Sequence, residues 1–450
     1  MRILVLGCTN IAISLITELV DQGHNVTMVA ERGDVLQNIQ RRFDIKTVIG
    51  SPSYPDVLRS ANASSMDVMI AVTESDEANM VACQVAYSLF DVPCKIAKIQ
   101  SEHYLIRNEL FSNDNLPIDV FLHPERTVAL QLSALLNNPG ASVVAPLIDD
   151  ALFCVAVRLH ASAHILGEKI CDCSAMFLHY NAHCVSVRRK EQWLTPVHHG
   201  LFAEGDTAYF VVPKSSIQPM LDVIQVPCYK QLKQVIIAGG GRIGLALAEH
   251  LIAQGCSVKM LEHCAKRCKA LAKKLPKAVV LQGDASEREL LYQEGVDGAD
   301  VFCALTSDDE DNIISALQAK YLGAKQVLSL VNNSEYMEIF AKSDVDVFMP
   351  PQQGTISDIL SAIRPAPFQR GITLCRGLAE MVVLTYIGLQ SMVGNKRHRS
   401  KLPAGIVFCG VWRAQVYLAD CDMSLEPGDQ LIYWVTDKKN ISLLEHILAA

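Results

Sequence analysis

A glycine-rich turn with the residues of a phosphate-binding loop lies in the second half of the chain. It follows a short apolar run, precedes a segment of helical periodicity, and consists of Gly239, Gly240, Gly241, Arg242, Ile243 and Gly244. In a loop of the pattern G-x-G-x-x-G, the glycine at position 239 allows the tight bend, and the one at 241 lets a pyrophosphate approach the backbone. The glycine at 244 lets the helix pack on the strand. The free N–H groups of the helix N-terminus attract phosphate. The pattern predicts a nucleotide-binding loop.

An acidic residue stands where ribose recognition requires one. Glu262 ends the next apolar run, 23 residues after Gly239. A carboxylate at this position accepts hydrogen bonds from ribose hydroxyls. It also repels a 2′-phosphate, so it favours NAD(H) or a plain adenine nucleotide over NADP. The alternative is a glycine turn beside a solvated glutamate.

Three further polar residues follow the next apolar runs. Asp284 lies in a Gly-Asp-Ala turn, Thr306 precedes the acidic run 308–311, and Asn332 follows the last of these runs. Ligands of doubly wound sheets bind outside the carboxyl ends of the strands, which makes all three candidate ligand contacts. The acidic run also suits a helix N-terminus, and Asn332 also suits a simple turn.

The chain contains an internal duplication. ILVLGCTNIAISL corresponds to VIIAGGGRIGLAL with an offset of 232 residues, and DVMIAVTESDEANM to DVFCALTSDDEDNI with an offset of 233. A shorter pair, LFAEGDTAYFVV and SLEPGDQLIYWV, is offset by 223. The order is therefore long, short, long, short. We expect a first Rossmann-like lobe (1–137), a first small lobe (138–226), a second Rossmann-like lobe (232–353) and a second small lobe (354–450).

Each long lobe alternates expected strands with helices. In the second copy, strands are expected over 235–238, 258–261, 279–281, 301–305 and 327–331, and a helix over 242–253. This alternation predicts an α/β fold with a doubly wound parallel sheet. The short lobes mix a short helix with strands and predict small α+β units.

Composition limits the class of protein. The net charge of −8 argues against a large nucleic-acid surface. The fifteen cysteines are dispersed, which indicates buried thiols in a reducing compartment. No run approaches 18 apolar residues, so no membrane-spanning helix is expected. The N-terminal residues lead directly into an apolar run that we interpret as the first strand, not as a signal peptide. No metal or catalytic constellation is predicted.

Together these features resemble the TrkA family, the peripheral nucleotide-binding subunits of bacterial Trk potassium-uptake systems. The resemblance rests on the duplicated glycine loop, the acid, the G-D-A turn, the T-x-x-D-E-x-N loop and the E-x-G-D lobe. The stretches ESDEANMVACQVAYSLF and PPQQGTISDIL are especially distinctive. It covers essentially the whole chain and implies KTN/RCK-type Rossmann-like lobes, each followed by an RCK-C lobe.

The resemblance also implies a functional setting. A member of this family is a cytoplasmic homo-oligomer, a homotetramer or a dimer of dimers, on the cytoplasmic face of the inner membrane. It docks on a TrkH/TrkG-type integral membrane potassium transporter and gates it. Its ligands are NAD or NADH, with ATP and ADP as further candidates. It is not an enzyme.

The first copy departs from this pattern. Thr9 stands where the pyrophosphate passes, Ala30 replaces the acid while Glu31 follows one residue later, and Lys98 replaces a family arginine. The sequence therefore predicts weak or absent nucleotide binding in the first lobe. The candidate contacts in this lobe are Gly7, Cys8, Thr9, Asn10, Ile11, Glu31, Thr73, Glu74 and Lys98.

Other interpretations remain open. The chain is alternatively a nucleotide-sensing gating ring of another cation channel or an antiporter, or an NAD-dependent oxidoreductase. The basic loop 396–401 is either a solvated loop or a surface that faces an anionic membrane or a transporter loop.

Overall fold

The structure is a computed structural model. It describes residues 1–105, 108–112, 114–195, 200–225, 229, 231–340, 343–364, 367–387, 402–403, 405–413, 416–418, 425–437 and 440. The basic loop 396–401 lies outside the described residues.

The first Rossmann-like lobe contains a six-stranded parallel sheet in the order β3-β2-β1-β4-β5-β6. Its strands are β1 (Arg2–Leu6), β2 (Asn25–Ala30), β3 (Lys46–Ile49), β4 (Val68–Ala71), β5 (Cys94–Lys98) and β6 (Val120–Leu122). Its helices are α1 (Asn10–Asp21), α2 (Gly33–Arg42), α3 (Pro55–Ser60), α4 (Asp76–Phe90) and α5 (Glu102–Leu105). This is the doubly wound strand order.

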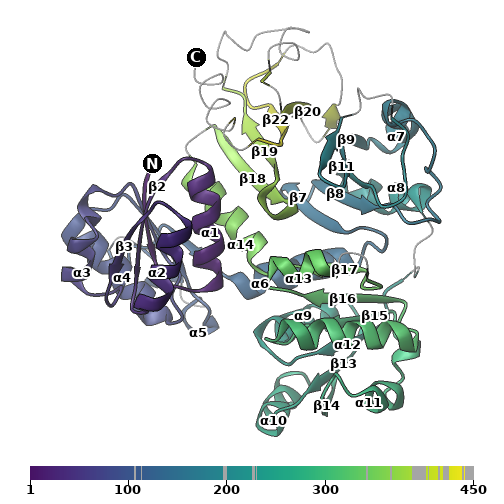
Figure 1. Ribbon diagram of the computed structural model, residues 1–450, viewed down its shortest axis with the longest axis horizontal. Helices are drawn as coiled ribbons and strands as arrows, with labels where there is room; N and C mark the ends of the chain where they lie inside the picture. Colours follow the sequence, from purple (N-terminus) through teal and green to yellow (C-terminus); the bar gives the residue numbers. More distant parts are fainter. Residues whose placement is uncertain are drawn as a thin grey trace. The chain divides into compact units, whose positions relative to one another are not determined.

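The second Rossmann-like lobe repeats this arrangement in the order β14-β13-β12-β15-β16-β17. Its strands are β12 (Gln234–Ala238), β13 (Ser257–Glu262), β14 (Val279–Gln282), β15 (Val301–Ala304), β16 (Gln326–Leu330) and β17 (Val347–Met349). Its helices are α9 (Arg242–Ala253), α10 (Ala265–Lys274), α11 (Arg288–Gln293), α12 (Asp309–Leu322) and α13 (Ser334–Ile339). The predicted fold class is confirmed (Figure 1).

Each small lobe contains a five-stranded sheet with antiparallel pairs, in the orders β10-β9-β11-β8-β7 and β18-β19-β22-β20-β21. The first contains β7 (Val143–Ile148), β8 (Leu152–Arg158), β9 (His183–Arg189), β10 (Gln192–Leu194), β11 (Thr207–Pro213), α7 (Cys173–Phe177) and α8 (Ile217–Ile224). The second contains β18 (Phe368–Leu374), β19 (Ala379–Thr385), β20 (Ile406–Arg413), β21 (Val416–Leu418) and β22 (Gln430–Val435).

Alternate residues of the central strands separate two apolar layers in each Rossmann-like sheet, because successive side chains of a strand point to opposite faces. On β12, Val235 and Ile237 pack with α9 and α10, whereas Ile236 and Ala238 pack with α11 and α12. In the first lobe, Ile3 of β1 packs with buried residues of α1 and α2 in the same way. The central strands are therefore buried on both faces, which explains their continuous apolar runs.

One helix from each half completes the core of the other half. The compact units are unit 1 (residues 1–124, 352–408 and 422–450) and unit 2 (residues 125–351 and 409–421). Helix α6 (Pro124–Leu136) therefore leaves the first sheet for unit 2, and α14 (Gln352–Ile363) leaves the second sheet for unit 1. The lobe boundaries expected from the sequence stay a prediction, because these units combine segments from different lobes.

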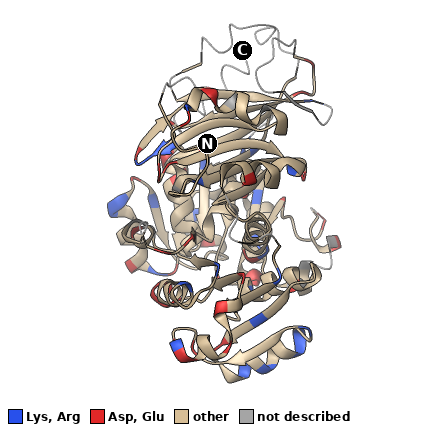
Figure 2. Cartoon of the chain, turned by 90° about the vertical axis from the view of Figure 1, so that its right-hand side faces the viewer, with Lys and Arg blue, Asp and Glu red and all other residues tan. Residues whose placement is uncertain are grey.

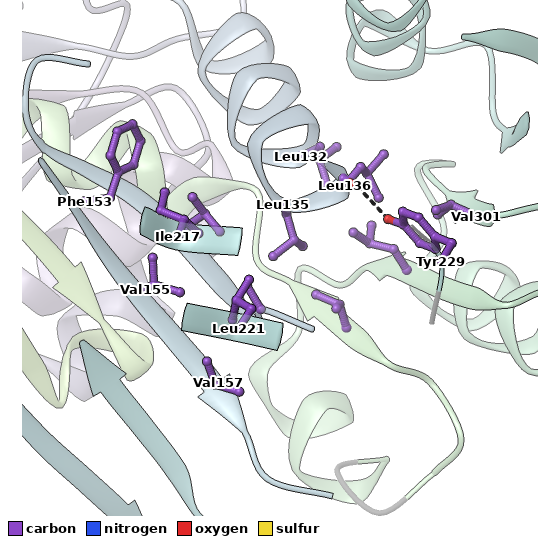
Figure 3. Close-up of a cluster of buried hydrophobic side chains, with 14 of the residues drawn as sticks. Leu132, Leu135, Leu136, Phe153, Val155, Val157, Ile217, Leu221, Tyr229 and Val301 are labelled. Carbon is purple, nitrogen blue, oxygen red and sulfur yellow. Dashed lines mark hydrogen bonds between the residues drawn. The ribbon is translucent and has the colours of Figure 1, made fainter. Parts of the chain in front are cut away.

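The apolar face of α6 lies in the main core of unit 2. Leu132, Leu135 and Leu136 are buried beside β8 and α8 (Figure 3). The hydroxyl of Tyr229 donates a hydrogen bond to the carbonyl of Leu136 at 2.6 Å and so satisfies the helix end. In unit 1, Ile359 and Leu360 of α14 pack with α1 in the same manner.

The described cysteines are unpaired thiols. Burial raises the pKa of Cys83 and of Cys303 to about 12, so these two stay protonated at neutral pH. Within the part of the chain that the structure describes, none of the helices combines the length and the apolar character needed to cross a bilayer.

Two glycines make the turn between β12 and α9 possible. Gly239 has a φ of +104°, and a Cβ there would lie 2.7 Å from the carbonyl oxygen of Leu305. A Cβ on Gly244 would lie 2.1 Å from the carbonyl oxygen of Gly239. In the first copy, Gly7 has a φ of +107° and packs as closely on Thr73, which explains why this glycine is present in both copies.

We expect Gly244→Ala to lower the free energy of unfolding by about 1–3 kcal/mol, because the added methyl group meets backbone that cannot yield cheaply. The third position of such loops generally accepts alanine, as at Ala12, but the contact here is too short. Urea unfolding of the full chain measures the change. Gly241→Ala is the control, because its Cβ would meet only the Leu305 oxygen, at 4.0 Å. Equal stabilities of the two variants would contradict the assignment.

Candidate functional site

The carboxyl ends of five parallel strands bring the candidate residues of the second Rossmann-like lobe to one edge. The glycine loop follows β12, and Glu262 ends β13. The other candidates follow the remaining strands: Asp284 follows β14, Thr306 follows β15 and Asn332 follows β16. The structure thus places them where a doubly wound sheet binds its ligand. Their contact with a nucleotide stays a prediction.

Two helices begin at this edge with different charges. Gly241 is the N-cap of α9, and no acidic residue follows in the first turn. By contrast, α12 begins behind Asp308, which accepts a hydrogen bond from the N–H of Asp311 at 2.9 Å, and three further acids occupy its first turn. A phosphate group is favoured at the N-terminus of α9, which has no side-chain cap and no acid and begins with Arg242, and is repelled by the acidic N-terminus of α12.

Glu262 is buried and braces the glycine loop. One carboxylate oxygen accepts a hydrogen bond from the N–H of Gly240 at 3.0 Å, and the other accepts one from the N–H of Cys264 at 2.9 Å. The Arg267 side chain donates to the carbonyl of Gly240 at 2.6 Å on the same turn. A carboxylate has about four acceptor positions, so hydrogen bonds from ribose hydroxyls remain compatible with this bracing role.

Arg242 opens α9 and meets a residue that the sequence analysis missed. Its guanidinium lies 3.6 Å from a carboxylate oxygen of Glu125, near the N-terminus of α6. The Arg242 side chain is 62% exposed, whereas that of Glu125 is 18% exposed. No local pattern identifies Glu125, because it precedes the loop by more than a hundred residues. The next loop residue, Ile243, packs on the core.

Asp284 is engaged within its own turn. Its carboxylate accepts hydrogen bonds from the N–H and the hydroxyl of Ser286, both at 2.8 Å. These bonds, that from the N–H first, hold the pKa of Asp284 below its usual value. Partial burial, followed by the nearby charge of Asp308, raises the pKa of Asp311. Negative charge therefore collects at the loops after β14 and β15.

Thr306 and Asn332 are held by two residues that the sequence analysis did not single out. The buried Asn312 accepts hydrogen bonds from the N–H and the hydroxyl of Thr306, and Asp309 accepts hydrogen bonds from the N–H and the side-chain amide of Asn332. Asn79 and Asp76 bind the matching loops of the first copy. The repeated T-x-x-D-x-x-N spacing was the signal for these loop-holding residues.

In the first Rossmann-like lobe a threonine side chain caps the helix N-terminus. Thr9 is the N-cap of α1; its hydroxyl oxygen accepts from the N–H of Ala12 at 3.3 Å and donates to the carbonyl of Val72 at 2.9 Å. Asn10 is exposed at the start of α1, and Ile11 packs on the core. A phosphate at this position would compete with the threonine side chain for a backbone donor.

The buried acid at the end of β13, Glu262, has no counterpart in the first copy. Ala30 is buried at the end of β2, and Glu31 is exposed beyond it. Cys8, which stands at the position of Gly240, packs against the core beside α1. In the second copy the side chains of Leu271 and Glu262 fill the space beside Gly240, and a Cβ there would lie 2.3 Å from Leu271.

One buried basic group lies at the carboxyl ends of the strands in the first Rossmann-like sheet. The Lys98 side chain is 3% exposed and its ammonium lies 3.7 Å from a carboxylate oxygen of Glu74, which is 81% exposed. Thr73 is bound to Asn79, and the backbone of Gln100 to Asp76. The first copy therefore has the same hydrogen bonds within its loops as the second, but different residues at the predicted ligand contacts.

The two edges differ in the ligand that they fit. The second combines an uncapped helix N-terminus with an acid at the ribose position, which suits NAD(H) or an adenine nucleotide. Among the described residues, no group of three or more His, Cys, Asp and Glu side chains is placed to hold a metal ion.

Comparison with known sequences identifies the family. The model of the TrkA-N domain matches residues 3–124 and 235–351. The Trk system potassium uptake protein TrkA of Haemophilus influenzae is 35% identical over 452 residues, which cover 99% of this chain and 98% of that protein. The protein of the same name from Halomonas elongata is 34% identical over 451 residues, with the same coverage.

Solved structures share the fold. The GsuK RCK domain superimposes with a TM-score of 0.63 at 19% identity, over 100% of this chain and 95% of that chain. A GsuK channel bound to NAD superimposes with a TM-score of 0.61 at 20% identity, over 100% of this chain and 79% of that chain. With two TrkA-N matches and relatives that align over nearly their whole length, the chain belongs to the TrkA family.

Proposed function

We propose that the chain is the regulatory subunit of a Trk-type potassium-uptake system and that it senses nucleotide with its second Rossmann-like lobe. The observation that carries the proposal is the open N-terminus of α9 behind Gly241, with Glu262 buried beside it. The names of the full-length relatives support the potassium-uptake setting. The NAD-bound neighbour supports a nicotinamide dinucleotide as ligand.

In this proposal the chain regulates and does not catalyse. NAD, NADH, ATP or ADP binds at the second edge, and the ligand favours one of two conformations of a homotetramer or dimer of dimers. The oligomer docks on the cytoplasmic face of the inner membrane against a TrkH/TrkG-type transporter. A ligand shifts the gate only by its difference in affinity for the two conformations.

We expect one NADH to bind per chain, because the first copy caps its own helix N-terminus and lacks the ribose-binding acid. Gly241→Ala should lower the affinity by about tenfold or more, since it places a methyl group where the pyrophosphate approaches. Isothermal titration of the full chain measures both quantities. The matched control is Thr9→Ala in the first lobe, which should leave NADH binding unchanged. Two sites per chain would contradict the expectation.

The Glu125–Arg242 pair gives a prediction about phosphate charge. Glu125→Gln should strengthen ADP binding by about twofold to fivefold, because it removes a carboxylate that competes with phosphate for the Arg242 guanidinium. Arg242→Gln should weaken ADP binding. Glu289→Gln on α11 removes the same charge on the opposite side of the sheet and serves as the control. Unchanged affinity in Glu125→Gln would show that the pair does not limit binding.

The physiological role is tested by potassium uptake in cells of the natural host. Loss of the protein should abolish the uptake that depends on it, and the full-length chain should restore that uptake. Gly241→Ala at equal protein level should restore less, because the sensor binds its ligand more weakly. Full restoration by this variant would separate potassium transport from nucleotide binding at the second edge.

A further inference from the structure

Helix α10 presents an isolated positive face on an acidic chain. Between Glu262 and Asp284 the sequence contains six lysines and arginines and no acid, whereas the whole chain has a net charge of −8. The lysines, Lys266, Lys269, Lys273, Lys274 and Lys277, are all exposed. In Figure 2, blue positions are numerous at the lower end of the chain, the height at which Figure 1 labels α10.

The lysines form a row that points away from the protein. Lys266, Lys269 and Lys273 follow the spacing i, i+3, i+7, which places them on one side of a helix. Leu271 and Leu275, which anchor α10 in the core, lie on the other side. We name Lys266, Lys269, Lys273, Lys274 and Lys277 the lysine face.

No partner within the described part of the chain neutralises this face. None of its five ammonium groups has an ion pair or a hydrogen bond there. Arg267, by contrast, is turned toward the glycine loop and lies 4.0 Å from a Glu262 oxygen. The free charges are therefore those of the outward row.

The fold does not require this charge. The equivalent segment of the first copy, α2 and its flanks (residues 31–50), mixes four lysines and arginines with three acids. Both helices pack on their sheets through buried leucine or isoleucine. The lysine face is thus a property of the second copy alone.

The residue type points to a diffuse anionic surface. Lysine is a point charge on a flexible stem, whereas arginine provides the planar fork that fits one carboxylate or phosphate. A straight row on a convex helix contacts a flat surface along its length. Val279, 50% exposed, follows the row and adds apolar area at its end. Each lysine near an anionic bilayer contributes a similar increment of attraction.

We propose that the lysine face of α10 contacts the anionic headgroups of a lipid bilayer. This inference rests on the membrane-side location proposed above. The lysine face would bind the membrane directly, independently of any contact between the chain and a transporter.

The test is co-sedimentation of the full-length protein with vesicles of phosphatidylcholine containing about one third phosphatidylglycerol. We expect binding to these vesicles and none to pure phosphatidylcholine. Raising the salt from about 0.1 M to about 0.5 M should release the protein, because exposed charges are then screened. The variant K266Q/K269Q/K273Q should reduce the partition coefficient by about 100-fold.

The duplication provides a matched control. R41Q/R42Q/K46Q removes the same charge from the equivalent segment of the first copy and should leave vesicle binding within about twofold of the wild type. Equal losses in the two variants, or no loss in the lysine variant, would overturn the proposal. So would binding of the lysine face to soluble polyglutamate but not to vesicles, which would indicate an acidic protein partner. NADH titration of the lysine variant separates this failure from a failure of the nucleotide sensor, since its affinity should be unchanged.

Discussion

The structure depends on the burial of one helix from each half in the core of the other. Leu132, Leu135 and Leu136 of α6 are buried in unit 2, and each buried leucine contributes about 1.5–3 kcal/mol. Helix α14 fills the equivalent place beside α1 in unit 1. Neither Rossmann-like sheet therefore completes its apolar layer with its own half of the chain. The exchange also carries Glu125 to the glycine loop of the second copy, where it meets Arg242.

The two copies share one loop scaffold but differ at the N-terminus of the helix that follows the first strand. In both, a glycine of positive φ packs on the strand-end loop, and an Asp and an Asn hold the following turns. The helix N-terminus differs, because the Thr9 side chain accepts from one of its N–H groups in the first copy, whereas Gly241 provides no side-chain cap in the second. A helix N-terminus attracts phosphate only while its donors lack another acceptor. This difference supports the proposal that the second copy is the principal sensor.

The charge distribution separates the copies further. The second copy has both the glycine loop with its acid and the lysine face of α10, on the consecutive elements β12, α9, β13 and α10. The first copy has the scaffold, a buried Lys98 paired with Glu74, and a mixed-charge α2. Duplication allows such a division, since one copy can change its charged groups while both copies keep the packing that α14 and α6 require.

Local patterns in the sequence determined the fold class, the duplication and the strand ends at which candidate residues gather. The helix expected over 242–253 has those bounds in the structure, and the strand expected over 235–238 begins one residue earlier. Periodicity and turn chemistry act over a few residues, so the sequence alone reveals them. Only the tertiary structure decided that α6 packs in unit 2 and α14 in unit 1. It also decided that Glu125 lies beside Arg242, and that Thr9 caps α1 while its hydroxyl donates to the carbonyl of Val72. Periodicity marks an apolar face as buried, but the partner of that face is chosen by packing between segments far apart in the chain.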